Sequence, residues 1–393
     1  MNRHTPLILL LIITFGLLFH PYLPLPFKAC LYAASLTIKS VIIFVLPFII
    51  FSLLFKTVME LANRATVIIS LIIFCLIASN YLATFLSHYV GEAIYHLQLN
   101  IITPPTLGEG LMPAWHLTLP KLIDNNIAML LGLVFGLIGG KLQSKSMLKL
   151  SEQLNQITQF LLKYIIYLVP FFVVGFVMKL QQDGVMQMII QDYLQIFGII
   201  IITQIVYIVA YYFMINRFNL KVTYLSLKHI LPAAIAGFTT MSSAAALPLT
   251  MNAVSKHAIN KDIARSTVSV TTNIHLIGDC IGIPIFAYAL MKSFGVPAPS
   301  LLAYSLFAMY FVIAKFSVAA VPGGGIIVML PILEKHLGFS PDMLSLMLAL
   351  YILMDPIVTA INILGNGAFA KGIDQLITRG LKRAPLQDYQ PTL

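Results

Sequence analysis

The chain has 393 residues, of which 59% are hydrophobic and 10% charged, and its formal net charge is +10. Soluble globular domains carry about 25% charged residues, so this composition, with a mean hydropathy of +0.92, excludes a soluble globular protein and predicts a bundle of membrane helices. The positive charge does not indicate nucleic-acid binding, because Lys and Arg at the ends of membrane spans give the same bias.

The N-terminal half contains apolar stretches that are long enough to cross a bilayer, which requires about 20 residues. The first, "PLILLLIITFGLLF", has no small-residue cleavage site and is followed by further spans, so it is interpreted as a retained helix rather than a signal peptide. The predicted spans are Pro6–Phe27, Ala29–Phe55, Ala65–His96, Leu122–Gly140, Met147–Leu180 and Ile189–Ile215.

After Arg217 the apolar runs are interrupted by small, polar or helix-breaking residues at "FTTMSSAAALP", "TTNIHLIGDC", "AAVPGGG" and "NILGNGA". Lys and Arg flank Val222–Ser255 on both sides, so this run fits a hairpin that enters and leaves on one side of the membrane. Ser300–His336 fits a second hairpin that enters from the other side. Asp262–Lys292 and Pro341–Arg379 are expected to cross the membrane.

A hairpin followed by a crossing segment therefore occurs twice, in opposite orientations. This pattern indicates an inverted-repeat transporter with its site near the membrane midplane. The alternative is an ordinary bundle of continuous spans with glycine kinks. Most Lys and Arg fall in inner loops if both termini are cytoplasmic, and we expect a multi-pass protein of the bacterial inner membrane.

Four C-terminal motifs resemble those of the dicarboxylate/amino acid:cation symporter family, which includes the glutamate transporters. "MSSAAALPLTM" (Met241–Met251) and "AAVPGGGI" (Ala319–Ile326) resemble the tips of the family's two hairpins. "TTNIHL" (Thr271–Leu276) lies where the family has an Asn-Met-Asp-Gly-Thr break, and "MDPIVTAINILGNGA" (Met354–Ala368) resembles its last helix. The N-terminal half resembles the family only in hydropathy and span order.

The resemblance implies an all-α polytopic membrane protein with a glutamate-transporter-like fold of eight transmembrane helices and two re-entrant helical hairpins in an inverted repeat. Residues 1–63 would hold scaffold helices 1 and 2, residues 64–98 transport-domain helix 3, residues 99–187 scaffold helices 4 and 5, and residues 188–393 the core of the transport domain. The family further implies a homotrimer, embedded in membrane lipid, whose transport domains carry a small-molecule substrate across the membrane like an elevator.

Asp355 lies deep in an apolar run, where an ionised side chain costs about 2.5–3.5 kcal/mol and should face a partner or a cavity. The resemblance implies that Asp355 binds the substrate's amino group. Thr359 and Asn362 share its helix face, and the family implies substrate contacts for both, with interhelical hydrogen bonding as the alternative. The expected substrate-binding residues are Ser242, Ser243, Val321, Gly323, Asp355, Val358, Thr359 and Asn362.

Both hairpin tips are expected to bind a carboxylate group of the substrate. Ser242 and Ser243 stand at the start of a half-helix, where backbone N–H groups and the helix dipole favour an anion. The glycines Gly323–Gly325 would let the second tip approach the same group. A flexible turn is the alternative interpretation of these glycines.

Two departures from the family pattern bear on the substrate. Val358 and Met241 occupy positions where family members that take acidic substrates carry an arginine, and without its guanidinium a second carboxylate has no bidentate partner. We therefore expect a neutral amino acid, with a sodium- or proton-coupled dicarboxylate symporter as the alternative. A channel or an intramembrane enzyme built on Ser243, His275 and Asp355 is more remote, and we expect no enzyme.

The cation sites implied by the family are also altered. His275 and Asn366 stand where the family has aspartates that help to bind sodium, and Lys315 lies where backbone carbonyls bind a further sodium ion. The Lys315 ammonium is expected to replace that cation, the alternative being a lysine that snorkels to the surface. His275, with Asp279 on the same side, offers a structural hydrogen bond, a proton route or, as a more remote alternative from two ligands alone, a metal site.

Sodium coupling is therefore expected to be weakened or replaced, with sodium ions or protons as the possible coupling ions. We expect no cofactor, no metal site and no nucleic-acid partner. The expected cation or proton site consists of Asn273, His275, Lys315, Asn362 and Asn366.

Overall fold

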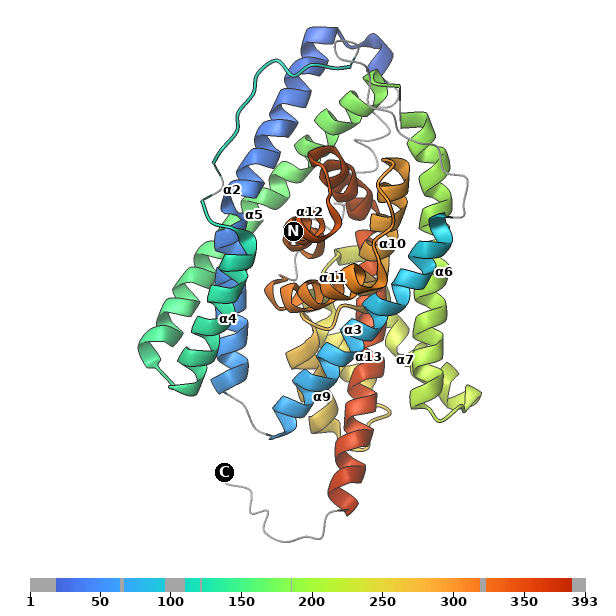
Figure 1. The fold of residues 1–393 in the computed structure, drawn as a ribbon. Coiled ribbons are helices and arrows are strands. Elements are labelled where there is room, and N and C mark those ends of the chain that lie inside the picture. The colour runs from blue at the N-terminus through green and yellow to red at the C-terminus, as the bar shows by residue number, and fades with distance from the viewer. Residues whose placement is uncertain are drawn as a thin grey trace.

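The computed structural model describes residues 19–63, 67–95, 110–120, 122–184, 186–318 and 323–383. Within these ranges the chain is largely helical and contains no strand (Figure 1). The earlier helices are η1 (His20–Tyr22), α2 (Leu25–Asn63), α3 (Val67–Tyr95), α4 (Asn125–Lys141), α5 (Lys145–Gln182) and α6 (Met186–Ile215). The later ones are α7 (Leu220–Thr240), α8 (Ser243–Ser255), α9 (Lys261–Thr271), α10 (Ile277–Ser293), α11 (Leu301–Ala314), η2 (Lys315–Ser317), α12 (Gly324–Leu337) and α13 (Pro341–Arg383).

Several of these helices are long and apolar enough to cross a membrane. Among the described residues they are Leu25–Ala62 of α2, Ile68–Tyr95 of α3, Asp192–Ile215 of α6 and Pro341–Thr378 of α13. Two parts of α5 together make a fifth candidate, bent by 43°. Pro170 lies at this bend, where its ring removes a backbone donor and clashes with the preceding turn. The chain is therefore a multi-pass membrane protein.

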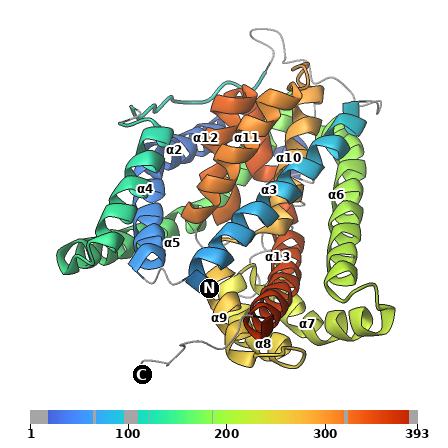
Figure 2. The ribbon, with the colours of Figure 1, turned by 60° about the horizontal axis from the view of Figure 1, so that its bottom comes forward.

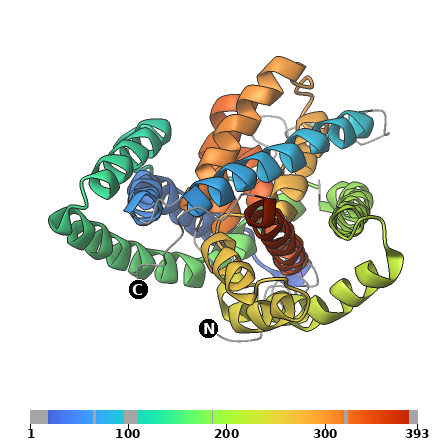
Figure 3. The same ribbon diagram turned by 90° about the horizontal axis from the view of Figure 1, so that it is seen from below.

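The helices pack as two units, which Figures 1 and 3 show side by side. The three-helix unit consists of α2 with α4 and α5 packed along it. The large unit consists of α3 and α6 to α13, in which α10 packs on α3, α6 and α13, and α13 packs also on α7 to α9. The units meet where η2 and α12 lie against α2 and where α5 reaches α6. Figure 2 shows α11 and α12 facing the three-helix unit.

Two helix pairs of the large unit are joined by short connections. The first pair, α7 and α8, turns at Met241, whose left-handed backbone (φ 50°) costs a non-glycine residue about 1–2 kcal/mol. Ser242 then starts α8 by accepting a hydrogen bond from the Ala245 amide (3.3 Å). In the second pair, α11 and η2 are followed by α12, before which Gly323 takes the left-handed conformation (φ 71°) without that cost.

The predicted break at Thr271–Leu276 is present, since α9 ends at Thr271 and α10 begins at Ile277. The predicted interruption at "NILGNGA" is wrong, because α13 is continuous through it. A Cβ on Gly365 would lie 3.1 Å from the side chain of Ile277, and one on Gly367 would lie 2.5 Å from the Tyr212 hydroxyl. These glycines therefore allow neighbouring helices to approach α13 rather than break it.

The predicted first span, Pro6–Phe27, lies mostly outside the described residues. Its described part differs from the prediction, because η1 covers His20–Tyr22 and α2 already starts at Leu25. Proline is tolerated in the first turn of a helix, where backbone donors have no partner in any case. Pro26 therefore lies inside α2 instead of separating it from the preceding segment.

Packing between α2 and α5 predicts that Gly175→Ala destabilises the protein. A Cβ at Gly175 would overlap the backbone carbonyl of Leu31, and overpacking of this kind costs about 1–3 kcal/mol. Gly198→Ala on α6 is the matched control, because an added Cβ there would meet no atom of another described element within 4 Å. Thermal unfolding of the purified proteins in detergent should show a lower midpoint for Gly175→Ala only, and equal midpoints would contradict the packing described.

Candidate functional site

A cavity with about 340 Å³ of empty space lies where the connections of the two helix pairs meet α10 and α13. It is closed mainly by polar groups and helix ends of the large unit. Its lining consists of Met241, Ser243, Thr272, Asn273, Leu276, Asp279, Val318, Gly325, Tyr351, Asp355, Thr359 and Asn362. We call this space the site cavity.

Helix ends of both polarities converge on the site cavity. Ser243, Leu276 and Gly325 belong to the starts of α8, α10 and α12, whose free N–H groups carry partial positive charge. Met241 and Thr272 follow the ends of α7 and α9, whose carbonyls carry partial negative charge. The cavity therefore offers donors for an anionic group and acceptors for a cationic group within one small space.

Asp355 is the carboxylate of α13 that lines this cavity, and it is 6% exposed. One of its oxygens accepts a hydrogen bond from the Gly323 amide (2.8 Å), and the other from the Thr359 hydroxyl (3.3 Å). Among the described residues no Lys or Arg forms an ion pair with it. Because a buried carboxylate is stable only with compensating partners, Asp355 is suited to bind an ammonium group.

Asp279, in the first turn of α10, is the second carboxylate of the cavity. It accepts hydrogen bonds from the Tyr351 hydroxyl (2.6 Å) and from the Asn362 amide (2.9 Å). Lys315 Nζ lies 3.6 Å from its Oδ1, and the two side chains are 0% and 2% exposed for Lys315 and Asp279. This ion pair joins the first arm of the second helix pair to α10.

The Lys315 ammonium has few other partners in the described part of the chain. It lies 4.3 Å from the centroid of the Phe311 ring, a cation–π contact, and makes no hydrogen bond there. Its full burial differs from the snorkelling alternative, in which the charge would reach the surface. Asp279 is therefore the main compensation for this buried positive charge.

His275 and Asn366 form a separate polar cluster that does not line the site cavity. His275 Nε2 is hydrogen-bonded to the Ser79 hydroxyl (2.9 Å), so the ring faces α3 rather than Asp279. Asn366 donates to the His275 carbonyl (3.1 Å) and accepts from the Thr271 hydroxyl (2.8 Å). The polar groups of these two positions are therefore engaged mainly with the protein's own backbone and hydroxyls.

The structure places the predicted residues in three settings. Ser242 caps α8 and Gly323 precedes α12, so both border the site cavity, whereas Val358 is buried (1% exposed) outside its lining. Val321 lies outside the described residues. The predicted residues that line the cavity are Ser243, Asn273, Asp355, Thr359 and Asn362.

Asp279 and Tyr351 are among the lining residues that were not assigned to the site from the sequence. Asp279 was considered only as a partner of His275, although a carboxylate within "LIGDCIGIPIF" already requires a partner inside the membrane. Tyr351 precedes Asp355 by one helical turn, a spacing that places both on one face. The sequence therefore offered a signal for Tyr351, namely its position on the helix face of Asp355, one turn closer to the N-terminus.

A larger cavity, with about 1390 Å³ of empty space, separates the two units beside the site. Lys56 and Glu60 of α2 and Gln159 of α5 contribute polar side chains to it. Asn273 and Val318 line both this cavity and the site cavity. We call it the inter-unit cavity, and it gives the site a polar approach that begins near the C-terminal end of α2.

Comparison with known proteins gives a family match over most of the chain. The model of the sodium:dicarboxylate symporter family matches residues 7–376. A Caenorhabditis elegans protein named as a sodium-dependent excitatory amino acid transporter (glt-6) is 24% identical over 198 residues, which are 49% of this chain and 35% of that protein. Excitatory amino acid transporter 1 of Rattus norvegicus is 24% identical over 245 residues, 60% of this chain and 44% of the relative. The matched regions thus span less than half the length of these curated relatives.

The hydrogen bonds of Asn362 predict that Asn362→Leu destabilises the site. The substitution leaves the Gly278 amide, now 2.8 Å from Asn362 Oδ1, and one oxygen of Asp279 without partners. Each buried unsatisfied group costs about 1–3 kcal/mol. Thermal unfolding in detergent should show a clear loss relative to Asn273→Leu, a matched control whose side chain is exposed; equal losses would show that the Asn362 contacts are unimportant.

Proposed function

The chain belongs to the sodium:dicarboxylate symporter family, and we propose that it is a secondary transporter of a small amino acid with a neutral side chain. The family is one of transporters and not of enzymes. The observation that carries the substrate assignment is the buried carboxylate of Asp355, which has no Lys or Arg partner in the described residues, in a cavity that also presents helix N-termini.

An amino acid fits the charges of this cavity. Its ammonium group would pair with the carboxylate of Asp355. Its carboxylate would lie at the N-terminal ends of α8 and α12, near Ser243 and Gly325. Met241 and Val318 supply apolar surface for a side chain. Since no arginine is among the described residues that line the cavity, a second carboxylate would have no guanidinium partner there.

Sodium coupling is weakened or replaced in this proposal. At two positions where the family's sodium ligands are carboxylates, the chain has His275 and Asn366, whose hydrogen bonds go to Ser79 and to neighbouring protein groups. The ammonium of Lys315 lies 3.6 Å from Asp279 Oδ1 and compensates the charge of this carboxylate beside the cavity. Hard cations such as sodium prefer several oxygen ligands, carboxylates above all. The carboxylate of Asp279 is already paired with the ammonium of Lys315.

The two packing units suggest how transport would proceed. The three-helix unit, with residues 1–63 and 99–187, would be the scaffold; residues 64–98 and 188–393 would form the transport domain. The pairs α7–α8 and α11–α12 would be re-entrant hairpins, the transport domain would move as an elevator, and three copies would assemble in the bacterial inner membrane with cytoplasmic termini. The few contacts between the units and the inter-unit cavity support a sliding surface.

A sodium-coupled or proton-coupled dicarboxylate symporter is the second candidate, because the matched family is described by sodium and dicarboxylates. Uptake into proteoliposomes distinguishes the two. A panel of neutral amino acids, acidic amino acids and dicarboxylic acids would be presented under imposed sodium, potassium or pH gradients. Saturable uptake of a neutral amino acid without a sodium gradient supports the proposal, whereas sodium-driven uptake of dicarboxylates contradicts it.

Met241 gives a direct test of the substrate assignment. Met241→Arg adds a guanidinium to the cavity lining and should let acidic amino acids compete for uptake, with an inhibition constant lowered about tenfold or more for a new charge-assisted pair. Met241→Gln is the control of similar length without charge. Competition by acidic amino acids that is the same in both variants would count against this orientation of the substrate.

Lys315 gives a test of the coupling assignment. Lys315→Met leaves Asp279 as an uncompensated buried charge, at a cost of about 3–5 kcal/mol, so transport by this variant should depend on sodium ions or protons. The double variant Lys315→Met/Asp279→Asn removes both charges and should not depend on them. The measurement is the initial uptake rate against sodium concentration at fixed pH and against pH without sodium, and unchanged responses in the single variant would contradict the role of Lys315.

A further inference from the structure

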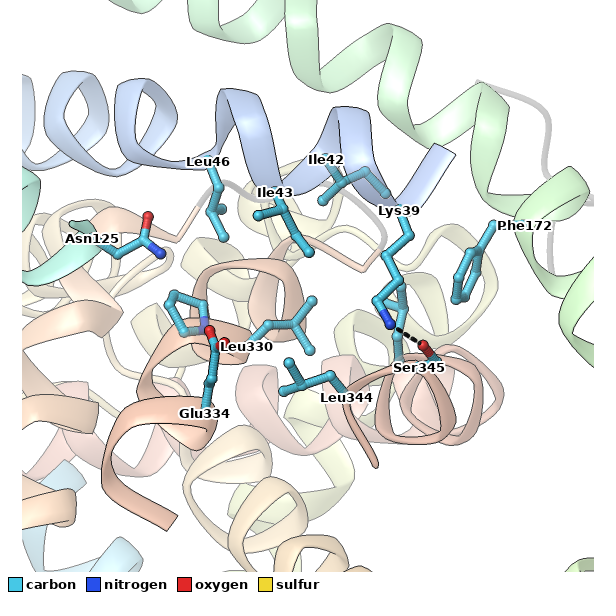
Figure 4. A pocket seen from close by; sticks show the side chains of 12 residues that line it. Lys39, Ile42, Ile43, Leu46, Asn125, Phe172, Leu330, Glu334, Leu344 and Ser345 are labelled. Carbon is cyan, nitrogen blue, oxygen red and sulfur yellow. Dashed lines mark hydrogen bonds between the residues drawn. The ribbon is translucent and has the colours of Figure 1, made fainter. Parts of the chain in front are cut away.

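Lys39 of α2 reaches from the three-helix unit to the large unit (Figure 4). Its Nζ donates hydrogen bonds to the Pro341 carbonyl (2.6 Å) and to the Ser345 hydroxyl (2.8 Å), both at the start of α13. Apolar side chains such as Ile42 and Leu344 lie beside the partly exposed contact, and Glu334 of α12 lines the same pocket. An ammonium in such a setting needs polar partners, and these two acceptors belong to the opposite unit.

The contact also marks the depth of the large unit along α2. Lys39 lies 14 residues after Leu25, where α2 begins, which corresponds to about 21 Å at 1.5 Å per residue. The first turn of α13 is therefore level with a point 14 residues along the 39-residue α2 rather than with its start. Figure 1 shows the same offset, with α2 and α5 extending above α10 and α12.

The two units are in contact on the Lys39 side, and a larger cavity lies between them on the other side. On the Lys39 side, Leu330 and Pro331 of α12 lie against Ile43 and Leu46 of α2, around a pocket with about 460 Å³ of empty space. On the other side, the inter-unit cavity leads from the C-terminal end of α2 to the site cavity. The cavity that shares Asn273 and Val318 with the site thus lies toward the C-terminal end of α2.

We propose that Lys39 is a positioning residue that holds the large unit at this depth and keeps the site open toward the C-terminal end of α2. The inference rests on the proposed function, in which the large unit moves along the three-helix unit. Movement by one helical turn, about 5.4 Å, takes the Pro341 carbonyl and the Ser345 hydroxyl out of reach of Lys39. The contact therefore stabilises one of two positions and is absent from the other.

Lys39→Met removes this contact cleanly. The Ser345 hydroxyl still donates to the Pro341 carbonyl (2.8 Å), so neither group is left without a partner. Lys28→Met is the matched control on the same helix, because the Lys28 ammonium bonds to Gln182 (3.1 Å) within the three-helix unit. Ser345→Ala is a second test variant that keeps the lysine and removes one of its two acceptors.

Two reporter cysteines read the position of the large unit in liposomes. Gln159→Cys places a thiol in the inter-unit cavity, and Ile43→Cys places one in the pocket beside Lys39. Cys30, which is exposed, is replaced by Ser throughout. A membrane-impermeant thiol reagent is applied from each side in turn, and the labelling rates of the two thiols are compared with the rate of uptake.

With Lys39→Met, labelling at position 43 should be about tenfold faster relative to position 159, the ratio given by losing about 1.4 kcal/mol of bias. Ser345→Ala should shift the same ratio less, and Lys28→Met should leave it unchanged. Unchanged ratios in both test variants, with uptake intact, overturn the role of Lys39 and leave the transport function standing. Absence of saturable uptake by the folded unmodified protein overturns the transport function itself.

Discussion

The site depends on how charge is compensated inside the membrane. An ionised group there is stable only beside an opposite charge or enough hydrogen-bond partners. The chain satisfies this condition for Asp279 with Lys315, Tyr351 and Asn362, all within one buried cluster. In the described part of the chain, Asp355 accepts hydrogen bonds from the Gly323 amide and the Thr359 hydroxyl and forms no ion pair with a Lys or Arg. Because of this difference, Asp279 is interpreted as part of a structural ion pair and Asp355 as the group that binds the substrate's ammonium.

Interrupted helices make this arrangement possible. The breaks between α7 and α8, between α9 and α10, and between η2 and α12 leave helix ends at the same cavity, where N–H groups and carbonyls are available to a solute. Gly325 shows how closely the parts fit, since a Cβ there would lie 2.5 Å from Asp279 Oδ1 and 2.6 Å from the Tyr351 hydroxyl. The close approach of α12 to α10 and α13 thus links the second helix pair to both carboxylates.

The sequence predicted part of this organisation well. Long apolar runs locate α3, α5, α6 and α13 to within a few residues, because twenty-residue hydrophobicity is a strong signal, whereas α2 runs to Asn63, well past the predicted end at Phe55. Pro-Gly-Gly-Gly and the Met-Ser-Ser turn indicated the two connections. The glycines of α13 were misread as breaks, because hydropathy does not distinguish a close helix contact from an interruption. The partner of Lys315 was also missed, since Asp279 lies in another element and no periodicity links the two.

The central claim is that the ammonium of Lys315, and not a sodium ion, compensates the negative charge of Asp279 beside the substrate. Equilibrium binding of the transported amino acid to the purified protein tests it most directly, measured in sodium chloride and in choline chloride of equal ionic strength. The account predicts dissociation constants that agree within about twofold, a difference below 0.5 kcal/mol. Binding that is lost in choline and restored by sodium would contradict it.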